Sequence, residues 1–180
     1  MTRLKDLMDI FLQPGELFVG DASFQIRTIL GSCVSMTLWH PKWRLGGMSH
    51  FLLPTRAGKA DSNALDGRYG DEALAVMFQD LKASGVNPLQ CEAKIFGGGN
   101  MFPGNRHARG QHARGLSVGM RNGEAARELL RLHGIAVVTE SLFGIGHRQI
   151  VFNVSNGDVW AKQIRPSLLE TDAEIAARGD

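Results

Sequence analysis

Residues 34–53 read VSMTLWHPKWRLGGMSHFLL and decide the fold that we expect for this chain. Residues 34–39 alternate apolar and polar side chains, which is typical of a half-buried strand. Pro41 suits the first central position of a turn. Residues 45–53 return as a second strand, which Pro54 ends. The sequence therefore predicts an antiparallel hairpin centred on Pro41 and Lys42.

This hairpin would bring a thiol and an imidazole together. Cys33 lies eight residues before Pro41, and His50 lies eight residues after Lys42, so the two are predicted to face each other. Directly opposed side chains have Cβ atoms about 4.5–5.5 Å apart. A thiol and an imidazole at that separation can form a thiolate–imidazolium pair, which is a nucleophile. A register slip of one residue would place them on opposite faces of the sheet.

The residues before Cys33 add to this candidate site. Gly31 and Ser32 indicate a sharp turn whose N–H groups are free to meet an oxyanion. The hydroxyl of Thr28, five residues before Cys33, can orient the imidazole or bind a substrate amide. Each residue also has an ordinary interpretation: a free cysteine is usually a core residue, and a threonine in a strand is usually structural. The hairpin pairing is what favours a catalytic role for Cys33 and His50.

The remaining patterns predict a layered α/β fold in one domain, with a largely antiparallel or mixed sheet and two main helices. Apolar spacing predicts one helix capped by Asp71 and ending near Gly85, and another capped by Asn122. We also expect a short helix over residues 4–12. Residues 11–20 are expected to contain a turn that leads into a strand, and the other expected strands are 24–30, 91–96, 135–140 and a hairpin of 149–154 with 159–164. The domain is predicted to span residues 1–165, followed by a tail over 166–180.

Composition excludes several classes of protein. The chain has 180 residues, of which 43% are apolar, and 20 Lys and Arg against 18 Asp and Glu give a net charge of +2. This balance does not favour a nucleic-acid partner. Two cysteines do not make a disulfide framework, and no segment resembles a signal peptide or a membrane span. We therefore expect a cytoplasmic protein without membrane insertion, in which a thiol stays reduced.

Other motifs point to no cofactor or metal. Gly97-Gly98-Gly99 lacks the Lys-Ser/Thr of a phosphate-binding loop, so we expect it to let another backbone approach closely. His107 and His112 have no cysteine or carboxylate at ligand spacing. Residues 93–123 carry five basic and no acidic residues. This basic stretch either steers an acidic partner or forms a solvated loop.

Four separated motifs resemble the CheD family of bacterial chemoreceptor glutamine deamidases. They are LGSCVS at 30–35, GMSHFLLP at 47–54, AKIFGGGNMF at 93–102 and VGMRN at 118–122. The resemblance runs from about residue 12 to residue 164. It implies an α/β sandwich related to deamidating toxins, with a papain-like Cys–His site in which Cys33 is the nucleophile and His50 the general base. The family threonine falls near Thr28, with Arg27 at the neighbouring position.

The resemblance also implies partners, and it leaves alternatives open. The implied substrates are methyl-accepting chemoreceptors, whose selected glutamine side chains become glutamates. A CheC-type phosphatase is a second implied partner. The chain can instead be a binding module that docks on receptors or on such a phosphatase without catalysis. A thiol hydrolase acting on small amides or peptide bonds is a third possibility.

Overall fold

The computed structural model describes residues 6–58, 63–103 and 116–166. Its strands and helices follow one another in the order β1 Met8–Phe11, β2 Leu17–Gly20, β3 Phe24–Leu30, β4 Val34–His40, β5 Leu45–Ser49, α1 Gly70–Ala83, the 3₁₀ turn η1 Pro88–Gln90, β6 Glu92–Gly97, α2 Val118–Leu132, β7 Val137–Leu142, β8 His147–Asn153 and β9 Val159–Ile164. The predicted tail falls almost wholly on residues 167–180, outside the described part of the chain.

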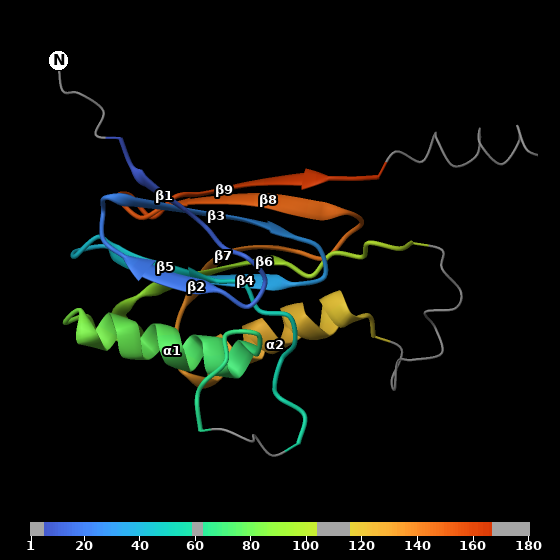
Figure 1. Ribbon diagram of the computed structural model, residues 1–180, viewed down its shortest axis with the longest axis horizontal. Coiled ribbons are helices and arrows are strands. Elements are labelled where there is room, and N and C mark those ends of the chain that lie inside the picture. Colours follow the sequence, from blue (N-terminus) through green and yellow to red (C-terminus); the bar gives the residue numbers. More distant parts are fainter. Residues whose placement is uncertain (1–5, 59–62, 104–115, 167–180) are drawn as a thin grey trace, which may run out of the picture.

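The elements form three layers (Figure 1). A four-stranded sheet in the order β1-β3-β8-β9 stacks on a five-stranded sheet in the order β2-β5-β4-β6-β7, and α1 and α2 cover the other face of the second sheet. Both sheets are mixed, because β1 pairs with β3 and β6 pairs with β7 in parallel while the other pairs are antiparallel. The predicted α/β class with mixed sheets and two helices is confirmed. The division into two sheets was not predicted from the residues alone.

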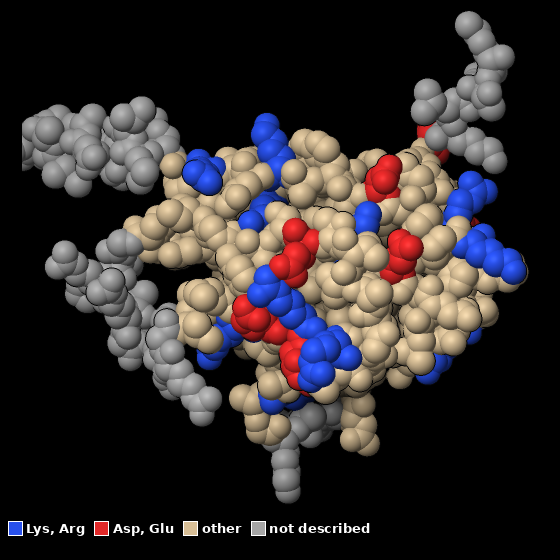
Figure 2. Space-filling view, turned by 180° about the vertical axis from the view of Figure 1, so that it is seen from behind, with Lys and Arg blue, Asp and Glu red and all other residues tan. Residues whose placement is uncertain are grey.

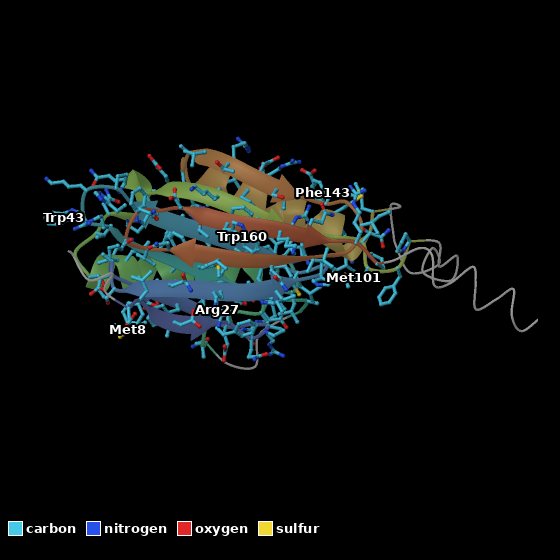
Figure 3. The ribbon with its side chains drawn as sticks, turned by 90° about the horizontal axis from the view of Figure 1, so that it is seen from above. Met8, Arg27, Trp43, Met101, Phe143 and Trp160 are labelled. Carbon is cyan, nitrogen blue, oxygen red and sulfur yellow. The ribbon has the colours of Figure 1, made fainter. Side chains whose placement is uncertain are left out.

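Two apolar cores separate the layers. The first lies between the sheets and includes Ile26, Leu30, Met48 and Phe152. The second lies between the five-stranded sheet and the helices, and its members include Leu38, Met77, Leu81, Ala126 and Leu130. Among the described residues, no helix covers the outer face of the four-stranded sheet, and Trp160 and Arg27 are visible there in Figure 3.

The N-terminal helix predicted over residues 4–12 is wrong where the chain is described. Residues 8–11 form the edge strand β1, whose Asp9 carboxylate accepts hydrogen bonds from the side chain of Arg27 on β3. Pairing with a strand distant in sequence overrode the local preference for a helix.

The helix starts also differ from prediction. Helix α1 begins at Gly70, one residue before the predicted cap Asp71. Helix α2 begins at Val118, because the hydroxyl of Ser117 accepts a hydrogen bond from Met120 N at 3.2 Å. Asn122 is therefore not a cap but a fully buried residue in the second turn. Within the described ranges, neither helix is long and apolar enough to cross a membrane.

Candidate active site

The chain crosses from one sheet to the other at the predicted site. Thr28 lies on β3 in the four-stranded sheet, Cys33 lies in the turn between β3 and β4, and His50 directly follows β5 in the five-stranded sheet. Thr28 and His50 are buried, whereas Cys33 is partly buried against the core between the sheets. All three residues therefore lie where the two sheets face each other.

The hairpin register differs from prediction by two residues. His40 pairs with Leu45, so the connection has four residues, 41–44, rather than two. Arg44 closes this turn by donating its N–H to the His40 carbonyl at 2.8 Å and adopts a positive φ of 46°. The further bridge between Val34 and Phe51 keeps the same register.

This register makes Cys33 and His50 diagonal neighbours. Continued from the Val34–Phe51 bridge, it places His50 opposite Ser35 and Cys33 opposite Leu52. A shift of two residues preserves the face of every side chain, so Cys33 and His50 still point to the same side. Diagonal pairs have Cα atoms about 7–8 Å apart, and their Cβ atoms are somewhat closer. The prediction of a shared face therefore survives, although the prediction of direct opposition is wrong.

The hydrogen bond that His50 donates to Thr28 fixes the tautomer of the ring. Thr28 Oγ1 donates its hydrogen to the Leu12 carbonyl at 2.8 Å and lies 2.7 Å from His50 Nδ1. A hydroxyl has one hydrogen, so Thr28 Oγ1 can only accept from His50 Nδ1–H. Neutral His50 therefore carries its proton on Nδ1, and its Nε2 is unprotonated and carries a lone pair. An imidazole in this state is a base.

Burial keeps His50 neutral. Its pKa is lowered to about 4, chiefly by desolvation, and the nearby Glu16 carboxylate opposes this only in part. The backbone around the ring is firmly held, because His50 N donates to the Glu16 carbonyl at 3.0 Å and His50 O accepts from Gly15 N at 2.8 Å. At neutral pH the ring is thus an uncharged imidazole in a fixed position.

Burial also keeps Cys33 protonated. Desolvation raises the pKa of its thiol. The thiol makes no hydrogen bond to any residue that the structure describes, including His50. Catalytic hydrogen bonds are often long in the free enzyme and tighten when substrate binds. Both pKa shifts favour a thiol and an imidazole at rest over the thiolate–imidazolium pair expected from the sequence.

In the turn before Cys33, the carbonyl groups are hydrogen-bonded, whereas two N–H groups are not bonded to any described residue. The carbonyls of Gly31 and Cys33 accept hydrogen bonds from Gly99 N at 2.8 Å and Gly98 N at 2.9 Å. The Ser32 carbonyl accepts from Asn122 Nδ2 at 3.0 Å. The N–H groups of Ser32 and Cys33 donate to no atom of the described chain. These two donors match the predicted place for an oxyanion.

The glycine triplet serves the close approach that its sequence predicted. Gly97 has a φ of 113°, and a Cβ there would collide with the Cys33 carbonyl. A Cβ on Gly98 would meet the Gly119 carbonyl at 2.6 Å. Glycine is therefore required for β6 to end against the Cys33 turn and for α2 to begin against the triplet.

Asn122 is the functional candidate that the sequence prediction missed. Its Nδ2 donates to the Ser32 carbonyl and, at 2.7 Å, to the Leu52 carbonyl. A polar residue at helical spacing from Ala126 and Leu130, on the apolar stripe of its helix, was the signal that could have revealed it.

The other predicted features give no second site among the described residues. No group of three His, Cys, Asp or Glu side chains there is placed to hold a metal ion. His107, His112 and three of the five basic residues of the stretch lie outside the described residues. Lys94, from the start of that stretch, donates to the Gly157 carbonyl at 2.8 Å. Figure 2 shows a face on which cationic and anionic side chains are interspersed.

Comparison with known proteins places this sequence among relatives of one family. The family described as "CheD chemotactic sensory transduction" matches residues 52–163, a range that excludes Thr28, Cys33 and His50. A "Probable chemoreceptor glutamine deamidase CheD 2" from Albidiferax ferrireducens is 63% identical over 92% of this chain and 93% of its own length. Relatives with corresponding names from Dechloromonas aromatica and Pseudomonas savastanoi are 42% and 40% identical, over 86% and 92% of this chain and 87% and 90% of their own lengths. The chain belongs to the CheD family.

Proposed function

We propose that this protein hydrolyses the carboxamide of selected glutamine side chains on methyl-accepting chemoreceptors, forming glutamate and ammonia. One observation carries the proposal: the hydroxyl of Thr28 holds His50 as the tautomer whose Nε2 is a free base, on the face shared with Cys33. The names of the relatives supply the substrate class. We place the reaction in the cytoplasm, where a free thiol stays reduced.

The chemistry follows from the neutral resting pair. His50 Nε2 takes the thiol proton as Cys33 Sγ attacks the carboxamide carbon, and the N–H groups of Ser32 and Cys33 stabilise the oxyanion. The imidazolium then protonates the leaving nitrogen, ammonia departs and a thioester remains. Neutral His50 next removes a proton from water, which attacks the thioester and releases glutamate and the thiol. These steps use no cofactor or metal.

The activity can be tested with a receptor cytoplasmic fragment. The purified chain should release ammonia from the fragment, and mass spectrometry should show glutamate at particular glutamine positions. A fragment in which those positions are already glutamate serves as the matched control and should release no ammonia. Binding of the fragment without conversion would instead support the alternative, an adaptor for receptors or for a CheC-type phosphatase. Burial of Cys33, which raises the pKa of its thiol, is the observation that favours this alternative.

The pH dependence of thiol alkylation tests the neutral pair. With Cys91 replaced by alanine, iodoacetamide should modify Cys33 slowly at neutral pH, and the rate should rise about tenfold per pH unit as thiolate forms. The sign follows from burial, which raises the pKa of the thiol and lowers the pKa of His50 to about 4. A rate that is high and constant between pH 5 and 7, as an ion pair would give, contradicts this expectation.

Removal of the Thr28 hydroxyl should leave the imidazole of His50 without its hydrogen-bond acceptor. We expect Thr28→Val to lower kcat by about 10- to 100-fold, because Nδ1 loses its acceptor and the ring can rotate or change tautomer. Nitrogen NMR of His50 should show loss of the Nδ1–H form. The matched control is Thr37→Val, since Thr37 is equally buried and makes only a long 3.5 Å bond to the Lys94 carbonyl. Unchanged kcat in Thr28→Val would exclude this role.

A further inference from the structure

Asn122 links the two segments that carry Cys33 and His50. Its Nδ2 donates one hydrogen to the carbonyl of Ser32, the residue before Cys33, and the other to the carbonyl of Leu52, two residues after His50. The side chain is fully buried. Both partners are carbonyl oxygens, so the amide must present its NH₂ group to them.

Few other bonds join these segments at this end of the hairpin. The regular pairing of β4 with β5 ends at Thr37 and Met48. The next N–H, that of Met36, donates to the Ser49 hydroxyl rather than to a backbone carbonyl. Two bonds of 3.1 and 3.0 Å then join Val34 and Phe51. The bonds of Asn122 lie beyond this bridge, nearest to Cys33.

The helix that carries Asn122 is itself fixed against the site. Ser117 caps its first turn, and Gly119 packs so closely on the glycine triplet that a Cβ would lie 2.5 Å from the Gly98 carbonyl. A Cβ on Gly123 would collide with the ring of Phe143. Figure 3 shows Phe143 and Met101 at the same end of the molecule, and Met101 packs on Gly31. Asn122 therefore projects from a helix that has little room to shift.

The bond to Ser32 determines where an oxyanion donor points. The Ser32 carbonyl and the Cys33 N–H belong to one planar trans peptide unit, so they point in opposite directions. When Asn122 holds the carbonyl on the side of α2, the Cys33 N–H faces away from the helix. The direction of the Ser32 N–H is determined in the same way, because it shares a peptide unit with the Gly31 carbonyl, which accepts a hydrogen bond from Gly99 N.

The amide acts through its two donors alone. Among the described residues, Asn122 Oδ1 has no hydrogen-bond partner. An apolar side chain of the same size would fill the space and avoid that unpaired acceptor, but it would leave the Ser32 and Leu52 carbonyls without their donor. Packing by itself thus favours leucine at this position rather than asparagine.

We propose that Asn122 is a positioning residue that aims the Cys33 N–H at the oxyanion of the deamidation intermediate. The inference rests on the proposed function and adds a residue to it. Asn122 touches neither the thiol nor the imidazole through a hydrogen bond, so it acts through the Ser32–Cys33 peptide unit. Its contribution is confined to steps in which an oxyanion forms.

The test compares two reactions of Cys33 in Asn122→Leu and Asn122→Ala. Deamidation forms an oxyanion, and we expect kcat to fall by about 100-fold with KM changed by less than about threefold. Alkylation by iodoacetamide forms no oxyanion, so its rate should stay within about twofold of wild type at every pH. Leu130→Ala, which removes a buried side chain from the same helix away from the site, controls for lost stability and should keep the wild-type kcat.

Thermal unfolding identifies which variants are folded, and Asn122→Ala serves if Asn122→Leu does not fold. Wild-type kcat in a folded Asn122 variant would overturn this inference alone. Equal losses of deamidation and alkylation would also overturn it, because they would indicate general loosening of the site. A wild-type chain that releases no ammonia from the receptor fragment would overturn the proposed function together with the inference.

Discussion

Replacing Cys33 by alanine should reduce deamidation of the receptor fragment to background, a fall in kcat of about 10⁴-fold or more. Alanine has no group that can form the thioester, so the remaining donors and His50 can only assist water. The measurement is ammonia release combined with mass spectrometry of the receptor peptides. In the wild type, rapid quenching with acid should trap an adduct on the peptide that contains Cys33.

The matched control is Cys91→Ala. Cys91 lies in the core between the five-stranded sheet and the helices, and burial raises the pKa of its thiol to about 11. We expect this variant to lose some stability and to keep its kcat. Wild-type turnover by Cys33→Ala would show that Cys33 is not the nucleophile. Loss of turnover in Cys91→Ala at a temperature where it stays folded would also contradict the assignment of Cys33 rather than Cys91 as the nucleophile.

Replacing His50 by alanine should lower kcat by about 10³-fold at neutral pH. Burial raises the pKa of the Cys33 thiol, so Sγ needs a base to lose its proton as it attacks, and this is the role that we assign to Nε2. The residual rate should rise with pH, because hydroxide then forms the thiolate without help. The measurement is kcat from pH 6 to pH 10 with the receptor fragment.

His40→Ala is the matched control for this variant. His40 is also buried, but it lies at the far end of β4, where its Nδ1 accepts from Trp43 N at 3.3 Å. It should leave kcat and its pH dependence unchanged. If His50→Ala retained the wild-type rate, or lost it equally at all pH values, His50 would not be the base.

The sequence predicted the features that depend on side-chain alternation and missed those that depend on long-range pairing. The faces of Cys33 and His50 follow from a period of two, so they survived an error of two residues in the register. The exact register depends on the turn, and the left-handed conformation of Arg44 is not one that its residue type favours. Residues 8–11 form a strand because β3 offers them a partner, which no local pattern reveals.

The hydrogen-bonded parts of the site were the hardest to predict. From the sequence, Thr28 has two possible roles, and orienting the imidazole is one of them. The tautomer of His50 follows only because Thr28 also donates its hydrogen to the Leu12 carbonyl, which the sequence does not reveal. Asn122 was assigned to a helix start because asparagine is a frequent cap, whereas Ser117 takes that role. Burial of the thiol, which disfavours the expected ion pair, depends on packing between two sheets.

The hydrogen bond from Thr28 to the Leu12 carbonyl makes the tautomer of His50 depend on the edge strand β1. Leu12 directly follows β1, and its N–H donates to the Arg27 carbonyl at 2.8 Å, so its position depends on β1 staying paired with β3. If β1 peeled away, the Thr28 hydroxyl would be free to turn and donate to Nδ1. The ring would then carry its proton on Nε2 and lose the lone pair that acts as the base. The enzyme would stay folded, but its kcat would fall as in Thr28→Val, through the rotation of one hydroxyl group.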